Sequence, residues 1–231
     1  MAASTTGHIA SWSELATLTQ KCADGTWIFR GEGTAGYPLK PKAGRVGGYR
    51  GAARKVPYKL ADEKQSLELF KRQARPHLTP TPASDLEWLA VAQHHGMSTR
   101  LLDWTESILV AAFFAAQEAG TKGDGVIYGV RNLRTLTKAE ERRPFSIRSS
   151  GIYRPPHIAP RIPAQRSVFT VHADPTAEFS TPELAAWRVS YAACTKIKRI
   201  LDTCAINEGS LFPDVDGLSR YIAWRYKWGK P

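Results

Sequence analysis

The sequence predicts a single α+β domain, in which four short strands pack with helices around one buried helix. The 231 residues suffice for one large domain with its own core. Residues 108–116 are all apolar, which is typical of a helix buried on every side. Short runs rich in β-branched and aromatic residues are expected to form the strands, at 26–30, 126–130, 167–172 and 187–191.

Four helices are predicted from capping boxes, in which a Ser or Asp precedes a Glu or Gln by three residues. The first helix should end at Gly25 and the third at Gly96, because glycine accepts the left-handed conformation of a C-terminal cap. The fourth is the buried helix, expected at 105–118 and running to about Gly120. The boxes are Ser11 with Glu14, Asp62 with Gln65, Ser84 with Glu87, and Asp103 with Glu106.

The C-terminal part of the chain is expected to add a strand and two helices. Residues 187–191 alternate between apolar and polar, which favours a strand, and a helix starting at Thr181 and Pro182 is the alternative. Apolar residues at helical spacing predict helices over 195–205 and 217–224. The segment L-F-P-D-V-D-G between them should form an ordered turn.

Two basic stretches, 33–61 and 131–166, are expected to lie on the surface as insertions. The first contains no acidic residue and mixes cations with tyrosines. Such mixtures are typical of surfaces that bind single-stranded nucleic acid, because rings stack on bases while cations follow the phosphates. A solvated loop explains the composition equally well. The candidate nucleic-acid contacts are Lys40, Lys42, Arg45, Arg50, Arg54 and Lys55.

Polar side chains are concentrated in the loop before the buried helix, between Gln93 and Asp103. The N-terminus of that helix, beside Arg100, is a candidate anion site because it carries free backbone N–H groups. The alternative for Arg100 is an interior ion pair with Asp103 or Asp214. Asp103 has a structural alternative too, as a helix N-cap.

His94 and His95 also have structural alternatives. Consecutive side chains point about 100° apart around a helix, so the two histidines should not face one site together, and at least one is expected to be structural. A zinc site is not expected, because no third ligand falls at a recognised spacing.

Charge and cysteine usage narrow the class of protein. Lys and Arg outnumber Asp and Glu by 32 to 21, a net charge of +11, which favours phosphate-bearing partners. The start of the chain has no secretory signal, and its apolar runs are too short to span a bilayer. Cys22, Cys194 and Cys204 lack metal-type spacing. We therefore expect a cytoplasmic protein without a membrane partner.

Several segments together resemble the FRG domain family. They are F-R-G at 29–31, Q-H-H-G-M-S-T-R-L-L-D-W-T at 93–105, the apolar helix ending in F-F-A-A, Q-R-S-V-F-T-V-H at 165–172 and L-F-P-D-V-D-G at 211–217. The resemblance covers roughly 27–224. It implies one FRG-type domain over 1–231, with a core at about 26–224 and the two basic stretches as insertions.

A weaker resemblance is to ADP-ribosyltransferases, and it implies small β-sheets around a cleft, with NAD as the substrate. That family places an Arg at the end of a first strand, an S-T-S-like motif before a helix, and a Glu on or before a later strand. Here Arg30, the Ser98–Thr99 pair and the segment ahead of Ser167 follow in that order. Gln165 stands near the position of the Glu.

The second resemblance also implies roles for individual residues. Arg30 would hold the pyrophosphate, and Ser98 or Thr99 would support that arginine or the ribose. Gln165 would bind the ribose hydroxyl, or Asp103 or Glu106 would supply the carboxylate that steadies the cationic sugar. The remaining NAD contacts would come from Gly31, His94, Thr99 and Arg100.

The sequence thus supports three functions. The first is an NAD-dependent ADP-ribosyltransferase, a toxin or phage-defence effector that modifies RNA, DNA or protein and is restrained by a neutralising antitoxin. The second is a non-catalytic module that binds a nucleotide or nucleic acid through Arg30, Arg100 and residues 40–59, including a domain that kept the fold and lost the reaction. The third is a metal-independent nuclease that uses His94 or His95.

Overall fold

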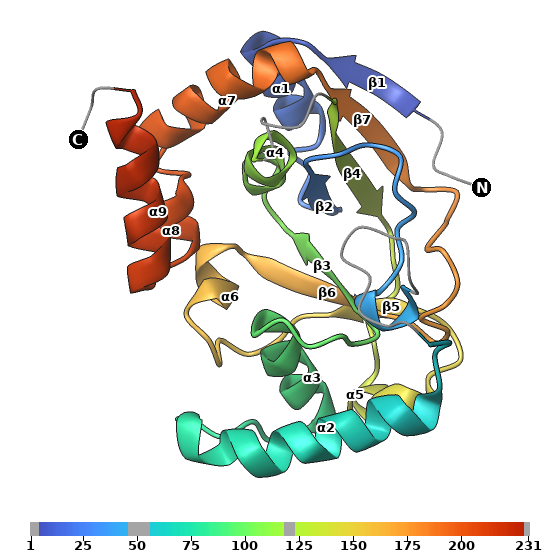
Figure 1. Cartoon of the computed structure of the whole chain (residues 1–231). Coiled ribbons are helices and arrows are strands. Elements are labelled where there is room, and N and C mark those ends of the chain that lie inside the picture. Colours follow the sequence, from blue (N-terminus) through green and yellow to red (C-terminus); the bar gives the residue numbers. More distant parts are fainter. Residues whose placement is uncertain (1–4, 46–55, 118–122, 229–231) are drawn as a thin grey trace.

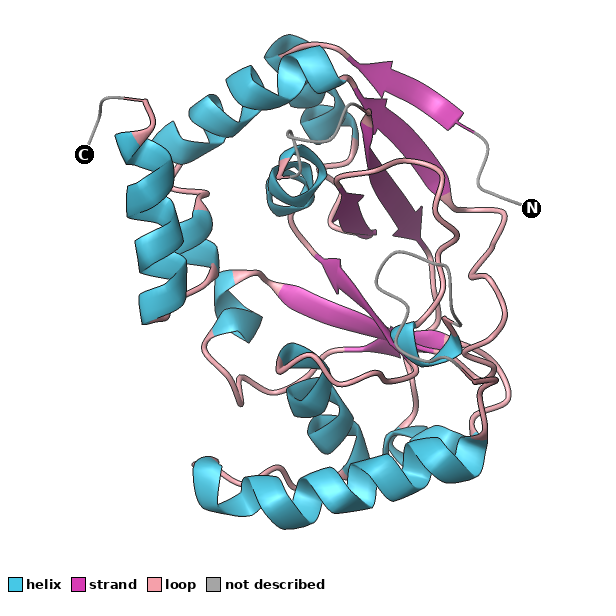
Figure 2. Ribbon diagram, viewed as in Figure 1, coloured by secondary structure: helices cyan, strands magenta, loops and turns pink. Residues whose placement is uncertain are grey.

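A computed structural model describes residues 5–45, 56–117 and 123–228, and its described strands form one mixed sheet (Figures 1 and 2). The strand order is β1-β7-β4-β2-β3-β6-β5. β1 and β7 are parallel, and every other neighbouring pair is antiparallel. The strands are β1 Thr5–Ile9, β2 Trp27–Glu32, β3 Leu101–Thr105, β4 Gly125–Arg131, β5 Gly151–Tyr153, β6 Ser167–Val171 and β7 Ala185–Val189.

Helices cover the two halves of this sheet in separate groups (Figure 1). α1, α4, α7 and α8 share a core with β1, β7, β4 and β2, whereas α2 and α3 share another with β3, β6 and β5. The helices are α1 Trp12–Lys21, α2 Leu60–Ala74, α3 Asp85–His94, α4 Ile108–Ala116, α5 Lys138–Arg142, α6 Arg161–Ala164, α7 Tyr191–Thr203, α8 Glu208–Leu211 and α9 Val215–Tyr226, with 3₁₀ turns at Lys42–Gly44, Arg75–His77 and Pro144–Ser146.

The sheet has its fewest paired residues between β2 and β3, at its centre. These two strands pair at the single position Phe29 and Thr105, whereas β2 pairs with β4 along its whole length and β3 pairs with β6 along its whole length. Beyond Phe29 and Thr105 the two backbones separate. The sheet is therefore split into halves at the place where the two groups of helices also meet.

Most of the predicted elements are confirmed. Ser11 caps α1 and Ser84 caps α3, each accepting a hydrogen bond from the amide of the residue three positions later. α3 ends next to Gly96, whose φ of 92° is the left-handed conformation expected there. α4 is largely buried, as its continuous apolar run predicts. The strands predicted near 26–30, 126–130 and 167–172 are β2, β4 and β6.

The start of the buried helix was predicted wrongly. Residues 101–105 form β3, and α4 begins at Ile108, five residues after its expected cap, with Ser107 as the N-cap. Asp103 is exposed and lies within the strand, so it caps no helix. Asp62 and Gln65 likewise form no capping box, because α2 already begins at Leu60 without a side-chain cap. The end expected at Gly120 lies outside the described residues.

Other corrections concern the sheet and the C-terminal part. There is one seven-stranded sheet instead of several small ones, and β1 lies in a segment where no strand was expected. The stretch 131–166 is not one long loop, since it contains α5, β5 and α6. β7 begins two residues before the predicted strand and overlaps it, so the helix alternative from Thr181 is wrong. α7 begins at Tyr191, four residues earlier than expected, and α8 was not foreseen.

Candidate functional site

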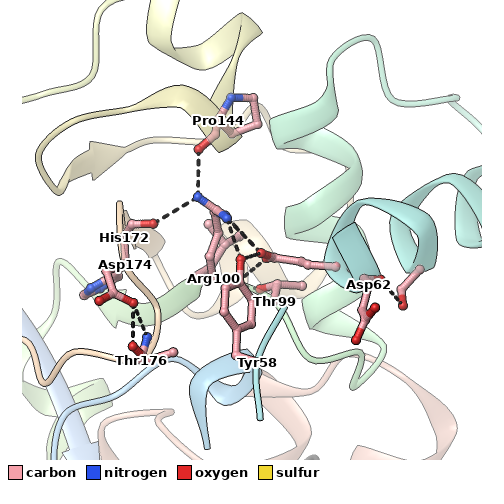
Figure 3. Close-up of polar contacts among 11 residues, drawn as sticks. Tyr58, Asp62, Thr99, Arg100, Pro144, His172, Asp174 and Thr176 are labelled. Atoms are coloured by element: carbon pink, nitrogen blue, oxygen red, sulfur yellow. Dashed lines mark hydrogen bonds and ion pairs between the residues drawn. The ribbon is translucent and has the colours of Figure 1, made fainter. Parts of the chain in front are cut away.

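Arg100, in the polar loop after α3, is a structural residue at the centre of a buried network (Figure 3). Its side chain is 2 % exposed and Glu63, its partner on α2, is 1 % exposed. Nη2 of Arg100 donates to Oε2 of Glu63 over 2.9 Å and to the Tyr58 hydroxyl over 2.9 Å, while Nη1 donates to the carbonyls of Pro144 and His172. The expected partners, Asp103 and Asp214, are not involved. Arg100 therefore ties α2 to the loop, and the anion site predicted beside it is not formed.

The hydroxyls next to Arg100 are engaged locally as well. Thr99 is fully buried, and its hydroxyl donates to the side-chain oxygen of Gln93. The same hydroxyl accepts a hydrogen bond from the amide of Leu101 over 3.1 Å. Ser98 is half-buried, and neither Ser98 nor Thr99 lines the cavity described below. These two hydroxyls therefore do not converge with Arg30.

The three residues of the F-R-G triplet have different positions at the split of the sheet. Phe29 is buried in the core beneath α4. Gly31 faces the same helix so closely that a Cβ atom would lie 1.8 Å from the carbonyl oxygen of Ala111, which leaves room only for a hydrogen. Arg30 lies between them in the middle of β2, not at its end. The glycine thus lets α4 approach, and the arginine is free to reach across the split.

A cavity of about 290 Å³ opens at the split, between the two groups of helices. It brings together five of the predicted site residues with the rings of five Phe and Trp side chains and a second arginine. Arg100, Ser98 and Thr99 are not part of its wall. The lining residues are Phe29, Arg30, Gly31, Gln93, His94, Asp103, Trp104, Thr105, Phe114, Arg161, Ile162, Gln165, Ser167, Phe169 and Phe212.

Arg30 is held in place on both sides of its guanidinium. Nη1 donates to the main-chain carbonyl of Asp103 over 2.8 Å, and Nε donates to Oε1 of Glu32 over 3.0 Å. The Asp103 carboxylate lies 3.7 Å from Nη1 and is 60 % exposed. Burial lowers the pKa of Arg30, but Glu32 and Asp103 outweigh it and the pKa is raised. The site therefore has a fixed cation beside an accessible carboxylate.

Arg161 and Gln165 form the wall contributed by α6. Nη2 of Arg161 donates to Oδ2 of Asp214 over 2.5 Å, and the guanidinium stacks 5.0 Å above the ring of Phe212. Nε2 of Gln165 donates to the carbonyl of Leu211 over 3.0 Å. α6 is thereby fastened to the turn between α8 and α9. Arg161 was not singled out in the sequence, where it sits in a Pro-rich stretch without a motif, although L-F-P-D-V-D-G pointed to its neighbour Phe212.

His94 is the titratable ring of the cavity. Burial lowers its pKa from 6.5 to about 4, with further lowering by Arg161 and His95, so it is neutral at pH 7. His95 is exposed and does not line the cavity, as the divergence of adjacent side chains predicts. A neutral imidazole can donate and accept a hydrogen bond without adding charge.

Two of the predicted nucleic-acid contacts in the first basic stretch, Lys42 and Arg45, bond to backbone carbonyls. Nζ of Lys42 donates to the carbonyl of Gly96 over 2.7 Å, and Nε of Arg45 donates to the carbonyl of Lys40 over 2.9 Å. The side chains of Lys40, Lys42 and Arg45 are half-buried. The other predicted nucleic-acid contacts, Arg50, Arg54 and Lys55, lie outside the described residues.

Two other kinds of feature are absent from the residues that the structure describes. No group of three or more His, Cys, Asp and Glu side chains is arranged to hold a metal ion there. No helix in those ranges combines the length and the apolar character needed to cross a membrane.

Comparison with known proteins identifies one family. No curated protein and no solved structure matches the chain. Residues 25–124, less than half of the chain, match the FRG domain. This range holds β2 with the F-R-G triplet, the buried Arg100–Glu63 ion pair, β3 and α4. The cavity walls formed by α6, β6 and Phe212 lie beyond it. The similarity to the FRG domain is therefore shown for residues 25–124.

Proposed function

We propose that the cavity binds NAD and that the protein is a mono-ADP-ribosyltransferase acting on a nucleic acid or a protein. The observation that carries this proposal is the position of Arg30, which crosses the split of the sheet beside the Asp103 carboxylate and lines the same cavity as Arg161. A guanidinium can bind phosphate oxygens through parallel N–H donors. Two of the five N–H donors of Arg30 are used by Glu32 and Asp103, and the proposal assigns the others to the diphosphate.

The size and lining of the cavity favour one half of a dinucleotide inside it. Ligand pockets in proteins commonly measure roughly 300–1,000 Å³, and the cavity of about 290 Å³ is at the lower limit. Phe114 and Phe212, in edge-to-face contact at 6.1 Å, offer apolar surface to a flat ring. The nicotinamide riboside half would enter, and the diphosphate would lie at the mouth between the two arginines.

The reaction would break the bond between C1′ of the ribose and the ring nitrogen of nicotinamide. Nicotinamide leaves with the electron pair, C1′ becomes an oxocarbenium-like cation, and an acceptor oxygen or nitrogen bonds to C1′ as it loses its proton. Asp103, the only carboxylate among the described lining residues, is assigned to stabilise that cation. Gln165, fixed through Leu211, would accept a hydrogen bond from a ribose hydroxyl, and neutral His94 would bind the carboxamide.

A non-catalytic nucleotide-binding module is the second candidate. The observation that favours it is the neutral Gln165 where ADP-ribosyltransferases carry a glutamate. In such a module Arg30 and Arg161 would still bind phosphate, but no transfer would follow.

One experiment separates these functions. The protein is incubated with NAD labelled in its adenylate phosphate, together with RNA, DNA or lysate proteins. We expect label to join one acceptor class, and Arg30→Ala to abolish the transfer. Arg142→Ala, an exposed arginine on α5, is the matched control and should transfer normally. Calorimetric binding of NAD without transfer would favour the binding module, and RNA shortening without NAD would favour a nuclease.

A further inference from the structure

A second cavity lies on the face of the sheet opposite α4, over β4 and β7. Val126 and Tyr128 of β4 line it and belong to the hydrophobic cluster on that face, whereas Ile127 between them belongs to the core beneath α4. Arg188 of β7 lines it as well, and in the sheet this residue lies opposite Val126. The cavity measures about 90 Å³, whereas a single water needs roughly 10–15 Å³. It therefore has room for part of a small organic molecule.

The interior of this second cavity is aromatic and apolar. Its walls include the rings of Tyr37, Tyr128 and Phe179, together with Leu39 and Leu184. The amide of Phe179 donates to the carbonyl of Leu39 over 2.7 Å, and the Tyr128 hydroxyl donates to the carbonyl of Tyr37 over 3.4 Å. Burial raises the pKa of Tyr128 to about 12, so this hydroxyl stays protonated at pH 7. Fixed walls of this kind suit the apolar part of a ligand.

Two opposite charges line the same cavity without pairing with each other. Glu178 is half-buried and Arg188 is exposed. Neither side chain forms an ion pair or a hydrogen bond with a residue that the structure describes. Beyond the effect of burial, Glu178 raises the pKa of Tyr128 and Arg188 lowers it, so both charges lie near its hydroxyl. A carboxylate and a guanidinium at one cavity are thus both available to a ligand.

These two charges select the class of ligand. A phosphate would be attracted by Arg188 but repelled by Glu178, and an uncharged ring would leave both charges unpaired. A zwitterion satisfies both at once, because a guanidinium binds a carboxylate through two parallel N–H donors and a carboxylate accepts from an ammonium group. The Tyr128 hydroxyl can accept a further ammonium N–H. Together with the aromatic walls, this combination fits an α-amino acid that has an apolar side chain.

We propose that the second cavity binds a free α-amino acid with an apolar side chain, whose carboxylate is bound by Arg188 and whose ammonium group is bound by Glu178. The side chain would lie against the rings of Tyr128 and Phe179. This site shares no described lining residue with the cavity at the split of the sheet. The proposal is therefore independent of NAD binding and of any transfer reaction.

Calorimetric titration of the full chain with blocked amino acids tests the two charge contacts. We expect L-phenylalanine to bind. Its amide, which lacks the carboxylate, and its N-acetyl derivative, which lacks the ammonium group, should each bind about tenfold more weakly or worse. Glycine, which lacks the side chain, should also bind more weakly by about tenfold or more.

Substitution of each charged residue assigns the contacts individually. Arg188→Gln should bind L-phenylalanine about as weakly as the unaltered protein binds the amide, and should no longer distinguish the two. Glu178→Gln should likewise no longer distinguish L-phenylalanine from its N-acetyl derivative. Arg72→Gln, an exposed arginine on α2, and Asp216→Asn, an exposed acid on α9, are the matched controls and should bind L-phenylalanine normally.

Thermal unfolding verifies that each variant is folded. Failure of both L-phenylalanine and L-leucine to bind at millimolar concentration would overturn the proposal. Equal affinities for L-phenylalanine and its two blocked derivatives would overturn it too, as would normal binding by the folded Arg188→Gln and Glu178→Gln variants.

Discussion

The Nη1 atom of Arg30 donates to the main-chain carbonyl of Asp103 over 2.8 Å, at the place where backbone pairing between β2 and β3 stops. The side chain thus makes a contact between strands that a backbone amide makes elsewhere in the sheet. It also holds the guanidinium 3.7 Å from the Asp103 carboxylate. The arginine of the F-R-G triplet is therefore both a brace across the split and a wall of the cavity.

Asp103→Asn should separate binding from chemistry in the proposed transferase. The substitution keeps the carbonyl that Arg30 contacts and removes only the negative charge. We expect the dissociation constant of NAD to change little and the single-turnover rate of label transfer to fall by about a hundredfold, or about 2.7 kcal/mol in the barrier. Glu106→Gln, which alters the other candidate carboxylate outside the cavity wall, should leave the rate unchanged. The reverse pattern would reassign the role to Glu106.

Gly31→Ala should destabilise the fold strongly, whether or not the cavity binds a ligand. The added methyl group would lie 1.8 Å from the carbonyl oxygen of Ala111, so α4 would have to move away from β2. Overpacking typically costs about 1–3 kcal/mol, and this backbone contact places the expected loss at the upper end or above. Urea unfolding measures it. Gly123→Ala is the control, because a Cβ atom there meets nothing within 4 Å, and equal losses in both variants would refute the explanation.

Glu63→Gln should also destabilise the protein, because it leaves the buried Arg100 guanidinium without its counter-charge. Breaking a buried ion pair costs about 3–5 kcal/mol. By contrast, Lys138→Ala removes an ion pair with Glu141 in which the lysine side chain is 86 % exposed, and should change the free energy of unfolding by less than about 0.5 kcal/mol. Chemical unfolding of the two variants compares them directly. Similar losses of unfolding free energy in the two variants would show that the Arg100–Glu63 pair does not hold α2 to the loop.

Stability should fall as the pH decreases from 6.5 to about 4. His172 is 2 % exposed, and burial, followed by Arg100 and Arg30, lowers its pKa from 6.5 to about 4. The unfolded chain therefore binds a proton in this range that the folded chain does not, so the stabilisation is complete above pH 6.5 and is lost toward pH 4. For His172 alone the loss is about 3 kcal/mol.

The variant His172→Gln tests the origin of this pH dependence. Glutamine can keep the hydrogen bond that Thr170 makes with the ring over 2.9 Å, but it does not titrate. Unfolding free energies measured between pH 4 and 7 should then show a shallower slope than in the unaltered protein, with His94 contributing the remainder. An unchanged slope would exclude His172 as its source.

Short sequence motifs correctly predicted the elements that are fixed by contacts between residues close together in the sequence. Ser84 and Gly96 define α3 because a cap is made within one turn of its own helix. The same rule gave a wrong prediction at Asp103, which has the spacing of a capping box with Glu106 but lies within β3. Residues 101–105 form a strand because they pair with 167–171, and that pairing joins residues about seventy positions apart. No local pattern contains that information.

The candidate site shows the same division. Arg30 and Gln165 were identified from motifs and do line the cavity, together with His94 and Asp103. Arg100 belonged to the most specific motif, yet its partner Glu63 is 37 residues away, so a fastening role could not be distinguished from a ligand role. Arg161 enters the cavity only because Asp214 draws it toward the turn after α8.

The single pairing of Phe29 with Thr105 also means that backbone hydrogen bonds contribute little to holding the two half-sheets together. Pulling the two half-sheets apart would break few backbone hydrogen bonds, whereas sliding or twisting either half would disturb full ladders on β4 or β6. Side chains therefore hold this seam together: Ile28 of one half shares a hydrophobic cluster with Leu102 and Trp104 of the other, and the Arg30 guanidinium bridges the two strands.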